Sequence, residues 1–165
     1  ARHLCSAWVY HAEKHDPRIR PVIADIAELP FEENSADFAF SINVFHHLED
    51  RESQRKAFES LGKVLKPAGK FYLHEMNLKN LFFRLYLNYF FPLVKTIEEG
   101  IENWIDPQMT STGNFVSDKI IYFTFMPEFA GRFLMKLLEP IEKRLENSRY
   151  AIYSAHYLRV FENRK

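Results

Sequence analysis

VIADIAELPF (22–31), ADFAFSINVFHHLED (36–50) and LGKVLKPAGKFYLHEMN (61–77) are the segments that decide the fold. Each contains a short apolar run bounded by polar or turn-forming residues, which is typical of a buried strand. We therefore predict strands over 20–24, 36–42 and 70–75. The second run shows little alternation of apolar and polar residues, so we expect it to be covered on both faces.

Between the second and third predicted strands, residues 52–65 show the apolar spacing of a helix. Lys66, Pro67, Ala68 and Gly69 then end that helix. A strand, a helix and a strand in this order predict a parallel sheet with right-handed crossovers.

Further elements are expected on either side of this region. The patterns predict a helix over 4–15, an aromatic helix over 81–91 that 96–104 would extend, a strand over 115–125, a helix over 128–145 kinked at Pro140, and a closing strand over 153–161. The 165 residues suit one domain.

Composition excludes some classes of function. Twenty-two basic residues balance 22 acidic residues, so the basic surface of a nucleic-acid-binding protein is not expected. The single cysteine, Cys5, cannot form an internal disulfide, which favours a reducing compartment and a cytoplasmic location. We identify no signal peptide at the N-terminus.

Polar residues at the ends of the first two predicted strands are candidates for ligand binding, because open α/β sheets bind ligands at the carboxyl ends of their strands. The Asp25 carboxylate can accept a hydrogen bond from an exocyclic amine, and the Ile26 N–H can donate to a ring nitrogen. Ser41 and Asn43 end the next strand. The alternative is that Asp25 caps a turn and that Asn43 caps the connection to the following helix.

The pair His46 and His47 is a candidate for proton transfer, because the pKa of histidine lies near neutrality. Two alternatives remain. Either ring can simply pack, or both can bind a metal ion together with Asp50, although adjacent histidines on a helix point in different directions.

Glu75 ends the third predicted strand at the same edge of the sheet. It can orient an acceptor hydroxyl or amine, or act as a base. The alternative is a surface ion pair with Lys70 or Lys79.

The aromatic segment 81–91 allows three interpretations: a lid over an apolar acceptor, a face that rests on a membrane surface, or ordinary core packing. Asn77, Asn80, Arg84 and Asn88 fall on one helical stripe, which leaves a wide apolar face. The segment is too short and too polar to span a bilayer.

The strings Asp25-x3-Leu-Pro-Phe, Ser-Ile-Asn (41–43), the histidine pair, and later YFTFMP (122–127) and SAHYLRV (154–160) resemble class I S-adenosylmethionine-dependent methyltransferases. The resemblance covers most of the chain. It implies a Rossmann-like α/β sheet with helices on both faces, and a helical insert before the last two strands. It also implies the cofactor S-adenosyl-L-methionine, with Asp25, Ile26, Ser41, Asn43 and His46 as its contacts.

The chain departs from that family in two ways. The glycine-rich turn after the family's first strand and the acid that ends its second strand are not found, and both would lie before Ala1. We therefore expect one partial methyltransferase domain, with a cofactor-side half at 1–77, a helical insert or lid at 78–112 and C-terminal elements at 113–165. On its own, this chain is expected to bind the cofactor weakly.

The chain also differs from that family in the turn before the third predicted strand. The family more often has glycine at the position of Ala68. A positive φ is unfavourable for alanine, so this turn is expected to differ locally.

The sequence thus favours methyl transfer by direct displacement to a small or lipid-like acceptor, with His46, His47 and Glu75 as candidate catalytic residues. One rival function is a non-catalytic, methyltransferase-like binding module that lacks the cofactor loop. Another is a metal-dependent α/β enzyme that uses the histidine pair.

Overall fold

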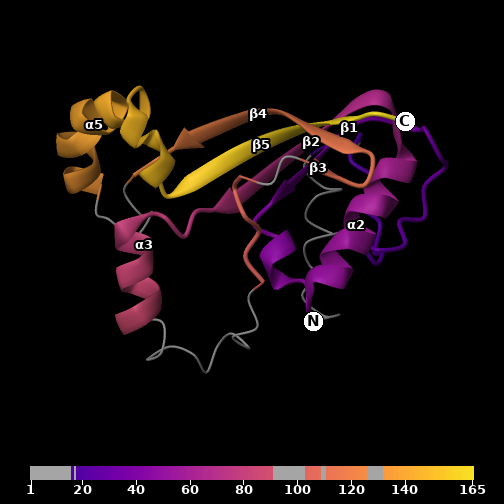
Figure 1. The fold of residues 1–165 in the computed structure, drawn as a ribbon, viewed down its shortest axis with the longest axis horizontal. Coiled ribbons are helices and arrows are strands. Elements are labelled where there is room, and N and C mark those ends of the chain that lie inside the picture. Colours follow the sequence, from indigo (N-terminus) through magenta and orange to yellow (C-terminus); the bar gives the residue numbers. More distant parts are fainter. Residues whose placement is uncertain (1–15, 17, 91–102, 109–110, 126–131) are drawn as a thin grey trace.

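The computed structural model describes residues 16, 18–90, 103–108, 111–125 and 132–165. A five-stranded mixed sheet forms its centre (Figure 1). In spatial order the strands are β1 (Ala36–Ile42), β2 (Leu65–Met76), β5 (His156–Asn163), β4 (Phe115–Phe123) and β3 (Ser111–Thr112). β1 and β2 are parallel, and all the other neighbouring strands are antiparallel.

The helices lie toward the two ends of this sheet (Figure 1). Among the described residues, the regular helices are α2 (Arg51–Val64), α3 (Leu81–Leu85) with a π-helical continuation η2 (Tyr86–Phe90), and α5 (Arg132–Glu146). Two short 3₁₀ helices, η1 (Phe45–His47) and η3 (Arg149–Tyr153), lie at the connections. α3 and α5 occupy one end of the molecule, and α2 the other.

α2 packs one face of the sheet through a cluster of phenylalanine rings. The helix begins because the Asp50 carboxylate accepts a hydrogen bond from the Ser53 N–H at 2.7 Å. Phe58 on α2 then contacts Phe71 on β2 and Phe161 on β5, each with 5.7 Å between ring centroids. Burial of these aromatic side chains dominates the core.

The opposite face of β1 differs from the prediction. Phe38, Phe40 and Ile42 are 61%, 67% and 54% exposed. The expectation that 36–42 is covered on both faces is therefore wrong for the part of the chain that the structure describes. The face that packs on the core carries the small residues Ala39 and Ser41, whereas the large apolar side chains of β1 lie on the exposed face.

The predicted strand over 20–24 is also wrong, because these residues are not in a strand and Ile23 is 68% exposed. A strand requires a neighbour with which to exchange backbone hydrogen bonds. In the described sheet β1 pairs only with β2, and the segment that follows residue 24 is bound instead to α2. There the Leu29 N–H donates to the Ser60 hydroxyl oxygen at 3.0 Å.

The other predicted elements agree with the structure or differ at their ends. Strand 36–42 and helix 52–65 are confirmed, and the last two strands are found as β4 and β5, the latter beginning at His156. Asn103 and Trp104 are not helical, so the extension of the aromatic helix does not reach them. The predicted helix over 4–15 and residues 96–102 and 128–131 lie outside the described residues. α5 continues through Pro140.

The aromatic segment is anchored by two asparagines that precede it. The Asn77 amide donates to the carbonyl oxygens of Ile152 (2.9 Å) and Ser154 (2.8 Å). The Asn80 amide donates to the carbonyls of Phe125 and Tyr153, while its side-chain oxygen caps α3. Asn77 and Asn80 are buried, so these members of the polar stripe hold the helix to the body of the protein and do not face water.

The segment between α2 and the paired part of β2 contains a strained residue. Ala68 has a φ of +63°, in the left-handed region that alanine adopts at a cost of about 1 kcal/mol. Gly69 follows, and a Cβ there would lie 2.8 Å from the Lys66 carbonyl oxygen. Ala68 therefore adopts the positive φ that glycine would adopt at no cost, so the expected local difference at this turn is not found in its backbone.

Replacing Ala68 with glycine should raise the free energy of unfolding by about 0.5–1 kcal/mol, because the positive φ is then unstrained. Urea denaturation measures the change. Ala57→Gly in the middle of α2 is the matched control, and it should lower stability by about 1 kcal/mol or more. Equal destabilisation by both substitutions would contradict this account of Ala68.

Candidate functional site

The carboxylate of Glu75 organises the region where β1 and β2 end. Its Oε1 accepts hydrogen bonds from the backbone N–H groups of Val44 (3.2 Å) and Phe45 (2.9 Å), and its Oε2 lies 2.5 Å from His46 Nδ1. Glu75 and His46 are each 1% exposed. The alternative of a surface ion pair is wrong, because Lys70 binds Asp118 and Glu162 instead.

This contact favours one tautomer of the His46 ring. A carboxylate that already accepts two N–H bonds acts as an acceptor toward Nδ1, so Nδ1 carries a hydrogen and donates it. In the neutral ring, Nε2 then has a free lone pair. Nε2 is buried and has no hydrogen-bond partner. The pair has the arrangement of a carboxylate-oriented histidine base.

Trp104 covers the other side of His46. The two rings are stacked, 4.7 Å apart and 11° from parallel. The preceding residue, Asn103, holds Trp104 in place, since its N–H donates to the His46 carbonyl at 2.8 Å and its side-chain amide donates to Leu48 O at 2.9 Å. Phe83 of α3 contacts the edge of Trp104 at 5.5 Å, which connects the aromatic segment to His46.

Two further polar atoms at the end of β1 lack partners. Ser41 Oγ and Asn43 Oδ1 are buried and form no hydrogen bond. Asn43 has a φ of +52°, and its N–H donates to the His74 carbonyl at 2.9 Å. Burying an unsatisfied polar atom is unfavourable, so these two oxygens are available to a polar ligand.

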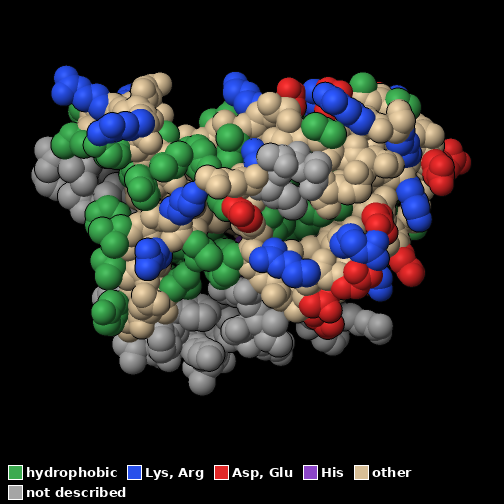
Figure 2. All heavy atoms as spheres, in the orientation of Figure 1, with side chains coloured by type: hydrophobic (Ala, Val, Ile, Leu, Met, Phe, Trp, Pro, Cys, Tyr) green, Lys and Arg blue, Asp and Glu red, His purple; other side chains and the backbone are tan. Residues whose placement is uncertain are grey.

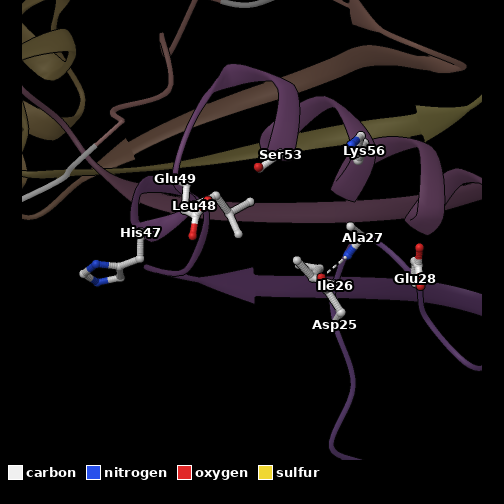
Figure 3. Close-up of a pocket in the computed structure, with 9 residues that line it drawn as sticks. All are labelled: Asp25, Ile26, Ala27, Glu28, His47, Leu48, Glu49, Ser53 and Lys56. Carbon is white, nitrogen blue, oxygen red and sulfur yellow. Dashed lines mark hydrogen bonds between the residues drawn. The ribbon is translucent and has the colours of Figure 1, made fainter. Parts of the chain in front are cut away.

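Asp25 and Ile26 line an open pocket of about 380 Å³, together with His47, Leu48 and other residues (Figure 3). One Asp25 oxygen accepts a hydrogen bond from the Ala27 N–H at 2.9 Å, so the turn-capping alternative is also satisfied. Asp25 is exposed.

The two histidines of the pair lie in different environments. His47 is exposed, and its ring points away from Asp25 and Ile26 (Figure 3), whereas His46 is buried against Glu75. Asp50 caps α2 through Ser53, which holds its pKa below the usual value. In the described residues, no three side chains of the metal-binding types come together to form a cluster.

The structure thus joins His46 to Glu75 at the end of β1, where Ser41 and Asn43 also lie. Asp25, Ile26 and His47 line a pocket beside them, and the His47 ring lies 4.0 Å from the His46 ring. Sequence reasoning missed Trp104 and Asn103, which are 58 and 57 positions beyond His46. Their only signal was an aromatic residue beside an asparagine, and this does not indicate a distant partner.

Comparisons with known proteins agree with this fold. Residues 3–73 match the family model described as methyltransferase domain. A solved S-adenosylmethionine-dependent methyltransferase from Methanosarcina mazei superposes with a TM-score of 0.56 over 94% of this chain and 77% of that one, at 16% identity. This likeness shows the fold.

Two curated relatives match shorter stretches. The Arabidopsis thaliana tRNA (carboxymethyluridine(34)-5-O)-methyltransferase is 44% identical over 48 residues, or 29% of this chain. Phosphoethanolamine N-methyltransferase 2 of Caenorhabditis elegans is 42% identical over 60 residues, or 36%. The alignments cover 12% and 13% of these relatives' lengths.

The sheet order and the structural likeness define a Rossmann-like α/β fold of the kind found in S-adenosylmethionine-dependent methyltransferases. Residues 3–73 are also similar in sequence to the methyltransferase domain family.

Glu75→Ala should lower the free energy of unfolding by about 3 kcal/mol, because it leaves the Phe45 N–H and the His46 Nδ1–H buried without an acceptor. Urea denaturation measures the loss, and ¹⁵N NMR of the imidazole reports whether Nδ1 keeps its hydrogen. Glu139→Ala, which removes an exposed helical partner of Lys143, is the control and should change stability by less than about 1 kcal/mol. Similar losses in both variants would contradict the central role of Glu75.

Proposed function

We propose that this chain takes part in methyl transfer from S-adenosyl-L-methionine to a small or lipid-like acceptor. The observation that carries the proposal is the buried Glu75–His46 pair, whose Nε2 lone pair has no partner. When bound, the cofactor supplies an electrophilic methyl group.

Asp25 and Ile26 are proposed to hold the adenine of the cofactor. The Asp25 carboxylate is exposed beside the pocket in Figure 3, and the apolar side chains of Ile26 and Leu48 line the same pocket. A carboxylate next to apolar surface suits a flat heterocycle that carries an amine. The unpartnered oxygens of Ser41 and Asn43 are proposed to bind the polar methionine part.

His46 is proposed to accept the proton of the methyl acceptor through Nε2. Glu75 would act as a positioning residue, because it holds the ring by Nδ1 and stabilises the positive charge that protonation creates. Trp104, stacked on the ring, would keep water from Nε2. Much of the acceleration in such a transfer comes from aligning two bound substrates. His47 is exposed and would contribute only at the rim of the cofactor pocket.

The lipid-like acceptor is supported by a second pocket, of about 360 Å³, beside α3. Leu81, Phe82, Phe125 and Tyr153 provide apolar walls, and Lys79 and Arg84 provide positive charge. A pocket with these properties suits a molecule that has an apolar part and an anionic group.

The same surface is proposed to rest on an anionic membrane. Leu81, Phe82, Leu85 and Tyr89 are between 43% and 68% exposed. Figure 2 shows hydrophobic side chains with lysine and arginine among them at the end formed by α3, whereas acidic side chains gather mainly toward the other end. This combination is typical of binding to a lipid surface. No helix in the described ranges has the length and hydrophobicity to cross a bilayer.

Cofactor binding can be tested with ¹⁵N-labelled chain and S-adenosylhomocysteine. We expect the amide signals of residues 25–28 to shift with weak affinity, on the order of millimolar. Asp25→Ala should weaken binding about tenfold, since one hydrogen bond to a carboxylate is lost. Asp118→Ala, on the exposed part of β4, should leave it unchanged. An absence of shifts at these amides would reject the cofactor role and favour a non-catalytic binding module.

Membrane contact can be tested by sedimentation with vesicles. The chain should bind vesicles that contain phosphatidylglycerol more strongly than vesicles of phosphatidylcholine alone. Salt at about 0.5 M, roughly three times physiological ionic strength, should weaken binding. Phe82→Asp should reduce bound protein severalfold. Ile23→Asp, at an exposed apolar side chain outside α3, is the control. Equal binding of both variants would contradict the proposed surface.

A further inference from the structure

Arg159 on β5 is a buried cation with no ion-pair partner among the described residues. It is 7% exposed, and its Nε is buried with no hydrogen bond. No carboxylate of the described residues lies within ion-pair distance of its guanidinium. A buried charge without compensation is strongly unfavourable, so proteins normally pair it or bind a counterion there.

The immediate surroundings of Arg159 are apolar. In the sheet it lies between Leu73 on β2 and Ile120 on β4, and its guanidinium stands 5.9 Å from the centre of the Phe161 ring. Burial lowers the pKa of Arg159 from its ordinary value. A contact with one ring compensates only part of this cost.

Tyr122 supplies an unused donor near this arginine. Its position on β4 is diagonal to Arg159 across the β4–β5 pair, within reach of long side chains on one face. Partial burial raises the pKa of the Tyr122 hydroxyl, which therefore stays protonated and can donate. Tyr157, by contrast, already donates its hydroxyl hydrogen to the Ile105 carbonyl at 3.2 Å.

The acidic neighbour that acts on Arg159 is Asp106, which favours the charged guanidinium from beyond ion-pair distance. Asp106 is exposed, and its Oδ1 accepts a hydrogen bond from the Gln108 N–H at 2.8 Å. Asp106 therefore does not neutralise the arginine, and a bound anion is the group that can do so.

We infer that Arg159 and Tyr122 form a binding site for an oxyanion, a carboxylate or phosphate group of the methyl acceptor. A guanidinium fork and a phenol match such a group. The site shares a sheet face with Glu75, because Tyr157 pairs with Glu75 and Arg159 follows two residues along β5, about 7 Å farther. This inference rests on the proposed methyl transfer for the identity of the ligand.

The anion site can be tested without cofactor, using the chain labelled with ¹⁵N at arginine Nε. Titration with inorganic phosphate, at constant ionic strength set by chloride, should shift one Nε–H signal in a saturable way. Arg159→Lys assigns that signal by removing it, and Arg144→Lys, at an exposed residue of α5, should leave it in place. Tyr122→Phe should weaken phosphate binding severalfold. A signal of Arg159 that does not respond to phosphate would overturn the site.

A variant separates ligand binding from a structural role. Arg159→Met keeps an unbranched apolar stem but removes the charged guanidinium, so it should raise the melting temperature in phosphate-free buffer and abolish stabilisation by phosphate. A lower melting temperature in that buffer would mean that Arg159 serves the fold, and would overturn the inference.

Two nucleosides distinguish whether the anion that binds Arg159 belongs to the cofactor or to the methyl acceptor. S-adenosylhomocysteine carries a carboxylate, and 5′-methylthioadenosine lacks it. If only the first compound shifts the Arg159 signal, the oxyanion is that of the cofactor and the assignment to the acceptor is overturned. If neither shifts it while phosphate does, the assignment is supported. Failure of the cofactor to bind at 25–28 would leave the phosphate result intact, so the two hypotheses fail separately.

Discussion

The Glu75 carboxylate is the constraint on which the site depends. It takes the place of a strand neighbour for the backbone just beyond β1, because it accepts the N–H groups of Val44 and Phe45. The chain therefore turns sharply at this point and brings His46 over the end of β2. Phe45 enters the core in the same turn, with its ring 5.0 Å from that of Phe58. Core packing and the orientation of the candidate base are thus set by one buried group.

Elements whose own residues show clear apolar spacing and turn residues could be predicted from local sequence patterns. The 36–42 strand, the α2 helix and the last two strands were predicted from apolar spacing and turn residues. The 20–24 strand was not found, because a strand depends on a neighbour and not only on its own residues. The candidate site was predicted at the level of residue types, but the His46–Glu75 contact joins positions 29 residues apart. Periodicity carries no information on such pairs.

In the aromatic segment, the polar stripe is found as predicted, but part of it faces the body of the protein. A polar stripe on an apolar helix normally marks the face toward water. Here Asn77 and Asn80 are buried because they satisfy backbone carbonyls of two other segments, and Leu81 and Phe82 are exposed. Asparagine, with donors and an acceptor on a short side chain, suits the joining of irregular segments. Only the tertiary structure shows that these carbonyls need partners.

The two asparagines also have a consequence for motion. Since each joins the start of the aromatic segment to the carbonyls of 152–154, and Asn80 also to Phe125, these regions share hydrogen bonds that cannot break independently. They form one cooperative unit of local unfolding. Backbone amides around η3 should then exchange with solvent at a rate governed by the opening of α3, although the two lie about 70 residues apart in the sequence. A molecule that binds to α3 would therefore slow hydrogen exchange at the beginning of β5.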